Sequence, residues 1–339
     1  MCEYYYMIRL LSKAGGEALQ YKGTYKGLND ITKSYLDSKT NKMILSLIFI
    51  LVLVITTFIA TFKLIGVSKD EIYLSKEEIQ NYINIADELS KDGYQINWQE
   101  IASINFVLNN ESFEINENNI TKIEDVLLKK DKDGNVVGIN NFKDSIKRLN
   151  FNSEQVELAS KNLKTLKNNY INDKLPKDEE KLEFIESVSE IAFDNYKNYG
   201  VLPSITISQA ILESGWGEST LSEEYNNLFG IKADSRWSGK TAELETKENY
   251  DDVIVGAFRA YDSFKSSIRD HGKFLYENER YAKNGLFEGK TYKEQAQALE
   301  NAGYSTAKDE EGNLIYADKL IRVIQENNLM LYDNLVEQK

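Results

Sequence analysis

The chain is poor in the residues that build several common kinds of site and linkage. Its 339 residues contain one cysteine, Cys2, and one histidine, His271. A single cysteine excludes a disulfide within the chain. A single histidine excludes a metal site made of several histidines, and a Ser-His-Asp triad could use only His271. Because His271 lies in the helical stretch SIRDHGKFL, we interpret it as a packed structural side chain.

Positive charge and proline are also scarce. The chain has 41 Lys and Arg against 54 Asp and Glu, a net charge of −13, and it has two prolines. Nucleic-acid-binding proteins carry basic patches, so we expect no nucleic-acid partner. So few prolines indicate a chain of helices and short loops, and no internal repeat is visible in it.

One long apolar run stands near the N-terminus. Residues 43–62 read MILSLIFILVLVITTFIATF and carry no charge, a length that spans a bilayer as a helix. A buried core helix seldom lacks a polar face, and a cleaved signal peptide has a shorter apolar region before a small-residue site. We therefore expect a transmembrane helix over 43–65, although a cleaved signal remains the alternative.

The charges before this run predict its orientation. Lys and Arg outnumber acidic residues in segment 1–42, at Arg9, Lys13, Lys22, Lys26, Lys33, Lys39 and Lys42. Positive residues stay on the cytoplasmic side of a membrane helix. We expect a single-pass protein of the cell membrane, with a cytoplasmic segment 1–42 and everything after Lys63 outside.

Residues 66–177 keep helical patterning within a polar composition, and we expect an extracytoplasmic helical stalk or small domain there. Apolar residues at helical spacing include Ile79 and Ile83, then Ile101 and Ile104, and then a run over 126–128. The stretch KKDKDGNVVGIN predicts a turn around its glycine. It lacks the glycine and the acidic residue at the positions that a calcium loop requires, so we reject a calcium site.

The most informative stretch is QAILESGWGES, residues 209–219. Pro203 and Gly215 predict the start and the end of a helix, which leaves Glu213 in the last turn. The negative end of the helix dipole and an apolar cover by Trp216 would both raise the pKa of the Glu213 carboxyl, as a general acid requires. Gln209, one turn earlier, could hydrogen-bond this carboxyl. Taken alone, a solvated surface glutamate at a frayed helix end remains the more common interpretation.

This stretch and several later motifs resemble the glucosaminidase family of bacterial cell-wall hydrolases, glycoside hydrolase family 73. The resemblance includes NNLFGIK from Asn226, TKENY from Thr246, FRAYDSF from Phe258, AGYST from Ala302 and YADKL from Tyr316. It implies a lysozyme-like catalytic domain over 178–339. The expected fold class is therefore α+β and mostly α. Residues 240–261 alternate in the manner of strands, so we expect a hairpin there that forms a small β lobe.

The resemblance also implies the site residues. The expected catalytic residues are Glu213, Glu248 and Tyr304, and the expected substrate-binding residues are Gln209, Trp216, Asn227, Phe229 and Tyr250. Glu248 is preferred over Glu243 and Glu245 because it best fits the family's threonine, glutamate and tyrosine, although Asn249 stands as an extra residue before Tyr250.

The implied function is an endo-β-N-acetylglucosaminidase that cleaves the β-1,4 bond after N-acetylglucosamine in peptidoglycan glycan strands. Such a reaction needs a general acid and a group that stabilises an oxocarbenium-like transition state, with no metal and no cofactor. Two alternatives remain open. One is a muramidase or lytic transglycosylase on the same fold, and the other is a non-catalytic wall-binding scaffold component.

Overall fold

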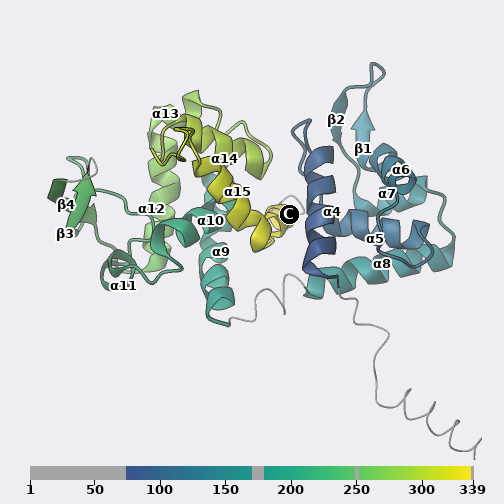
Figure 1. Ribbon diagram of the computed structural model, residues 1–339, viewed down its shortest axis with the longest axis horizontal. Helices are drawn as coiled ribbons and strands as arrows, with labels where there is room; N and C mark the ends of the chain where they lie inside the picture. Colours follow the sequence, from purple (N-terminus) through teal and green to yellow (C-terminus); the bar gives the residue numbers. More distant parts are fainter. Residues whose placement is uncertain (1–73, 170–178, 249–251, 337–339) are drawn as a thin grey trace, which may run out of the picture. The chain divides into compact units, whose positions relative to one another are not determined.

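The computed structural model describes residues 74–169, 179–248 and 252–336, which form helices and two small antiparallel sheets (Figure 1). All of these residues belong to one compact unit. The expected α+β, mostly helical fold is confirmed. The run at 43–62 lies outside the described residues, and within them no helix combines the length and the apolar character needed to cross a bilayer.

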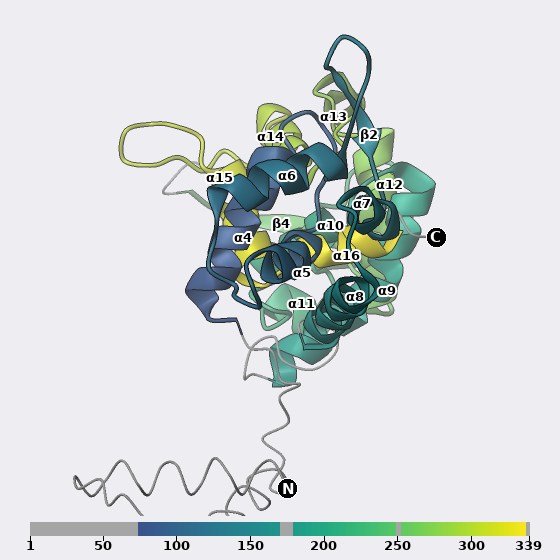
Figure 2. The same cartoon turned by 90° about the vertical axis from the view of Figure 1, so that its right-hand side faces the viewer.

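Residues 74–169 form the N-terminal helical part of this unit, which we call the helical domain. Its elements are α4 (Lys76–Leu89), α5 (Trp98–Leu108), α6 (Glu117–Leu127), β1 (Leu128–Lys130), β2 (Val136–Ile139), α7 (Phe142–Arg148) and α8 (Ser153–Lys167). Helix α5 packs against α4, α6 and α8 and lies among them in Figure 2. Trp98, Ile101 and Ile104 of α5 are at most 1% exposed, and burying each such side chain contributes roughly 1.5–3 kcal/mol.

One boundary in this domain differs from the expectation. The apolar run over 126–128 was expected to belong to a helix, but α6 ends at Leu127 and Leu128 begins β1. Asn140 donates hydrogen bonds from its backbone N–H to the Leu127 carbonyl at 2.7 Å and from its side chain to the Val126 carbonyl at 2.8 Å. These bonds satisfy the end of the helix and turn the chain into the hairpin, whose predicted turn lies at Gly134.

The remaining residues carry the central motif. Their elements are α9 (Glu179–Tyr199), α10 (Pro203–Ser214), α11 (Thr220–Tyr225), β3 (Thr241–Glu248), β4 (Asp252–Arg259), α12 (Phe264–Glu277), α13 (Glu279–Lys283), α14 (Tyr292–Asn301), α15 (Tyr316–Glu326) and α16 (Met330–Val336). Helix α10 is almost entirely buried and packs against α9, α14, α15 and α16 (Figure 1). The helix that bears the central motif is therefore held from several sides.

The predicted hairpin is present as β3 and β4, which pair in one continuous antiparallel register from Thr241 opposite Arg259 to Glu248 opposite Asp252. A short segment after α11 extends this sheet. Arg259 donates its backbone N–H to the Ile231 carbonyl at 2.9 Å, and Ala233 donates to the Ala257 carbonyl at 2.9 Å. The NNLFGIK motif thus leads directly into the β lobe.

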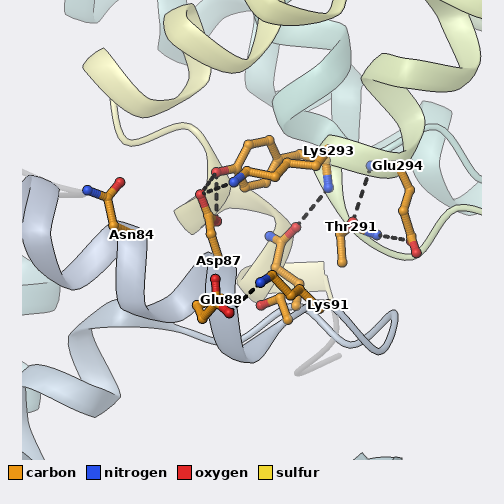
Figure 3. A pocket seen from close by; sticks show the side chains of 10 residues that line it. Asn84, Asp87, Glu88, Lys91, Thr291, Lys293 and Glu294 are labelled. Carbon is orange, nitrogen blue, oxygen red and sulfur yellow. Dashed lines mark hydrogen bonds and ion pairs between the residues drawn. The ribbon is translucent and has the colours of Figure 1, made fainter. Parts of the chain in front are cut away.

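The helical domain is joined to the rest by buried polar contacts. Gln95, 4% exposed, donates to the carboxyl of Asp333 at 3.0 Å and accepts from the backbone N–H of Tyr292 at 3.0 Å. Beside it, Asp87 of α4 accepts from the Tyr292 hydroxyl at 2.7 Å and pairs with Lys293 at 2.8 Å (Figure 3). The domain is therefore integrated with the rest of the described fold by specific side chains.

Candidate active site

Helix α10 carries Glu213, and the sequence explains both of its ends. Pro203 occupies the first turn, where a missing N–H costs nothing. Gly215 ends the helix in the left-handed conformation at φ 58°, and Glu213 lies in the last turn as predicted.

The N-terminus of α10 is capped by a residue far away in the sequence. Leu202, at the N-cap, provides no side-chain hydrogen bond. Instead, Asp333 of α16 accepts from the Ser204 backbone N–H at 2.8 Å and from its hydroxyl at 2.7 Å. Asp333 is 1% exposed and also receives the Gln95 amide. This carboxyl group therefore fixes the start of the helix whose other end carries Glu213.

The GWG turn after α10 is held in an unusual conformation. Gly215, Trp216 and Gly217 all have positive φ, at 58°, 64° and 85°, which is costly for a residue with a side chain such as Trp216. A Cβ on Gly217 would lie 2.9 Å from a ring carbon of Phe184, so the close approach also requires glycine. The Trp216 ring contacts Phe184 edge-on, with centroids 6.0 Å apart. Its ring is therefore anchored on α9 beside the motif.

The Glu213 carboxyl is held by a tyrosine that the sequence analysis did not select. The Tyr316 hydroxyl, at the start of α15, donates to Glu213 Oε1 at 2.7 Å. Gln209 Nε2 donates to the same hydroxyl oxygen at 3.0 Å. The expected direct bond from Gln209 to Glu213 is thus replaced by a relay through Tyr316. Gln209 is fully buried, so it orients Tyr316 from inside the core.

The environment of Glu213 favours its protonated form. The side chain is exposed at the surface, but the protein around the carboxyl raises its pKa by desolvation. The hydrogen bond from Tyr316 and the positive charge of Lys319 act in the opposite direction and are outweighed. A carboxyl group with a raised pKa, fixed through one oxygen, can keep its proton on the other oxygen and deliver it to a bound molecule.

Tyr304 lies beside this pair. Its ring stacks on that of Tyr316, with centroids 5.2 Å apart and planes at 18°. Burial and the negative charge of Glu213 raise the pKa of Tyr304 well above its usual value, so its hydroxyl is neutral. The structure therefore brings Glu213, Tyr304 and Tyr316 together from α10, from the turn after α14 and from α15.

Asn227 and Phe229 are buried instead of presented to solvent. Asn227, 1% exposed, donates to the Ile231 and Arg259 carbonyls at 3.1 and 2.8 Å. Phe229, 4% exposed, stacks on the His271 ring with centroids 3.8 Å apart. Burial lowers the pKa of His271 to about 3, so it is a neutral, packed side chain, as predicted. Because they are buried, Asn227 and Phe229 are better placed to support the site from inside the fold than to contact a substrate.

For Glu248, the second expected catalytic carboxylate, the structure describes the backbone but not the side chain. The backbone of Glu248 ends β3 opposite Asp252, and the side chains of Glu245 and Glu248 lie outside the description, as does Tyr250 altogether. The side chain of Glu243 is described and is exposed. In the described ranges, no group of three His, Cys, Asp or Glu side chains is arranged to hold a metal ion.

Comparison with known proteins finds relatives for the part of the chain that carries Glu213. A profile of the glucosaminidase family, described as mannosyl-glycoprotein endo-beta-N-acetylglucosaminidase, matches residues 189–329. The chain is 38% identical to exo-glucosaminidase LytG of Bacillus subtilis, over 46% of this chain and 55% of LytG. It is 34% identical to peptidoglycan hydrolase FlgJ of Vibrio parahaemolyticus, over 42% of this chain and 46% of FlgJ. It thus spans about half the length of these relatives.

Among solved structures, the catalytic domain of the autolysin Auto from Listeria monocytogenes is 31% identical, with 54% of this chain and 98% of that domain covered at a TM-score of 0.40. The family match contains α10, the β3–β4 hairpin and the start of α15. The C-terminal part of this chain, residues 189–329, therefore belongs to the glucosaminidase family of glycoside hydrolases.

Proposed function

We propose that the chain is a peptidoglycan hydrolase that cleaves the β-1,4 bond after N-acetylglucosamine, in the endo manner. The observation that carries this proposal is the Glu213 carboxyl, whose pKa is raised and whose Oε1 is fixed by Tyr316. The names of the relatives, an exo-glucosaminidase and a peptidoglycan hydrolase, support the sugar and the polymer, and the endo manner of cleavage is our own proposal. The experiment is digestion of purified peptidoglycan with mass analysis of the products. Failure to release fragments would favour a wall-binding scaffold instead.

In the proposed mechanism Glu213 is the general acid. Tyr316 donates to Oε1, so the acidic proton resides on Oε2 and passes to the glycosidic oxygen as the bond to the anomeric carbon breaks. Gln209 keeps the Tyr316 hydroxyl directed at Glu213 by donating to its oxygen. The positive charge that develops on the sugar then needs a stabilising group, and Glu248 and Tyr304 are the candidates.

Glu248 and Tyr304 should share this stabilising role. The N-acetyl group of the substrate can attack its own anomeric carbon, and the neutral Tyr304 hydroxyl can orient that amide. We expect Glu248→Gln and Tyr304→Phe each to lower kcat substantially, by about tenfold or more, but less than Glu213→Gln does. Steady-state turnover of peptidoglycan fragments measures this order.

The neighbouring glutamates of β3 are the matched controls. Glu243→Gln and Glu245→Gln should leave turnover close to wild type. A silent Glu248→Gln together with an inactive Glu243→Gln or Glu245→Gln would show that the catalytic carboxylate is one of its neighbours. A sugar ester trapped on Glu248 would also contradict this scheme, since it would mean direct nucleophilic attack.

We further propose that residues 43–65 anchor the protein in the cell membrane with its catalytic domain outside, where peptidoglycan lies. The motivation is the uncharged run over 43–62 after a basic segment. Protease added to intact spheroplasts should remove everything after Lys63 and spare residues 1–42. Recovery of a processed, soluble protein from the medium would instead identify the run as a cleaved signal peptide.

A further inference from the structure

A groove of about 970 Å³ lies where the helical domain meets the end of α9. Three short segments supply most of its lining: residues 93–95 before α5, the end of α9 with the turn into α10, and residues 287–290 before α14. Ile139 of β2 adds a fourth wall. The groove is open to solvent and is built by two regions of the chain, of which only one belongs to the family match.

The groove presents aromatic rings. Tyr94, Tyr196 and Phe287 line it, and each is only partly buried. The aromatic surface continues beyond the groove, because the Tyr276 ring lies 5.7 Å from that of Phe287 and 5.4 Å from that of Tyr199. Tyr276 is 58% exposed. A cluster of partly exposed aromatic rings of this kind suits a binding surface.

The groove also carries positive charge on an acidic protein. Lys197 and Lys290 line it together with one acidic residue, Glu288, and neither lysine forms an ion pair with any residue that the structure describes. The Lys290 ammonium lies 4.7 Å from the centre of the Tyr94 ring, which holds it at the groove wall. Against a net charge of −13, these lysines are a local attraction for an anionic polymer.

This groove is separate from the candidate active site. Leu202, which lines it, precedes the first residue of α10, whereas Glu213 lies in the last turn of the same helix. At a rise of about 1.5 Å per residue, the two ends are about 16 Å apart along the helix axis. One short sugar fragment bound at Glu213 would therefore not fill the groove.

We propose that this groove is a second, non-catalytic binding site for a glycan strand of peptidoglycan. The proposal rests on the proposed function and extends it. Pyranose rings expose C–H faces that stack on aromatic rings, and their hydroxyl and acetamide groups need polar partners such as the Tyr94 and Tyr196 hydroxyls. The carboxylates of the wall polymer suit Lys197 and Lys290. A strand held here raises the effective concentration of the polymer at Glu213 without taking part in the reaction.

The test separates binding of the polymer from catalysis. The full chain, carrying Glu213→Gln to prevent digestion, is co-sedimented with insoluble purified peptidoglycan. We expect Tyr94→Leu and Tyr276→Leu each to weaken Kd by about three- to tenfold, the effect of losing one aromatic contact. Tyr94→Phe and Tyr276→Phe keep the ring and should bind within about twofold of the parent protein.

Charge reversal provides an independent arm. Lys197→Glu with Lys290→Glu should weaken Kd by about tenfold at low salt and less at high salt, where exposed charges are screened. Lys122→Glu with Lys164→Glu is the matched control, since both lysines are exposed on the helical domain and the net charge changes equally. The proposal would be overturned if the two tyrosine-to-leucine variants and the double lysine variant all bound peptidoglycan as the parent does. An equal loss of binding in the Lys122→Glu with Lys164→Glu control would also overturn it.

Measurements of turnover show whether the groove proposal is wrong or the proposed function is wrong. With Glu213 intact, the groove variants should turn over a soluble tetrasaccharide fragment at the wild-type rate and lose efficiency only on the insoluble polymer. Equal losses on both substrates would contradict a separate binding site. If the wild-type chain cleaves neither substrate, the proposed function is wrong, whereas the sedimentation result still decides whether the groove binds glycan.

Discussion

Replacing Glu213 by glutamine should remove nearly all glycosidase activity. The amide keeps the shape of the side chain and can still accept the Tyr316 hydrogen bond, but it has no proton to give to the glycosidic oxygen. General acid catalysis contributes about 10²–10⁴-fold, so kcat on peptidoglycan fragments should fall by at least about 10²-fold. Near-normal turnover by Glu213→Gln would remove Glu213 from the mechanism.

The same residue should set the alkaline side of the pH profile. Because desolvation raises the pKa of Glu213, the acid form persists above the usual range of a glutamate, and activity should fall as the pH rises through that raised pKa. Tyr316→Phe deletes a hydrogen bond that lowers this pKa, so the alkaline limb should move to higher pH while kcat falls. An unmoved limb would mean that another group titrates.

Thermal stability is the control for the Glu213→Gln variant. A folded-state pKa above the unfolded value means that the folded protein binds the proton more tightly, so this group's contribution to stability is present at low pH and is lost as the pH rises through the raised pKa. The Glu213→Gln variant has no ionisable group at this position, so its stability does not fall in this way as the pH rises. At pH 7 its melting temperature should therefore equal or exceed that of the wild type, and lost activity cannot be ascribed to unfolding.

Among the substitutions proposed for this protein, Asp333→Ala should lower the free energy of unfolding the most. The carboxyl is buried and accepts hydrogen bonds from the Ser204 N–H, the Ser204 hydroxyl and the Gln95 amide. Alanine leaves the two Ser204 donors without this acceptor, while the Gln95 amide keeps the Met330 carbonyl at 3.3 Å. Each unsatisfied buried group costs about 1–3 kcal/mol, so the free energy of unfolding should fall by about 3 kcal/mol or more.

Urea unfolding followed by tryptophan fluorescence measures this change. Asp92→Ala is the matched control, because Asp92 is an exposed aspartate in the helical domain and should shift the midpoint very little. Similar midpoints for Asp333→Ala and Asp92→Ala would show that the buried bonds around Ser204 do not stabilise the fold.

Local features of the fold were predictable because they depend on neighbouring residues. Proline at 203 and glycine at 215 marked the limits of α10, and the helical stretch around His271 lies within α12. Alternation of side chains over 240–261 indicated the β3–β4 hairpin. The exception was Leu128, since an apolar run of three residues fits a helix as well as a short strand.

The contacts that assemble the site were not predictable in the same way. Tyr316 lies 103 residues after Glu213, and Asp333 lies 129 residues after Ser204. Periodicity shows which face of a helix is buried but not which side chain meets it. The motif YADKL indicated that Tyr316 belongs to the family pattern, yet nothing in its neighbourhood showed that its hydroxyl reaches Glu213. Gln95, 238 residues before Asp333, gave no signal at all.

The account is tested most directly by identifying the new reducing ends that the wild-type chain creates in purified peptidoglycan. Borohydride reduction followed by mass analysis of the released fragments identifies the terminal sugar. Cleavage after N-acetylglucosamine predicts reduced N-acetylglucosamine at every new end, released from within strands, and no such ends with Glu213→Gln. Reduced N-acetylmuramic acid would identify a muramidase, anhydro ends would identify a lytic transglycosylase, and either result would contradict the proposed bond specificity.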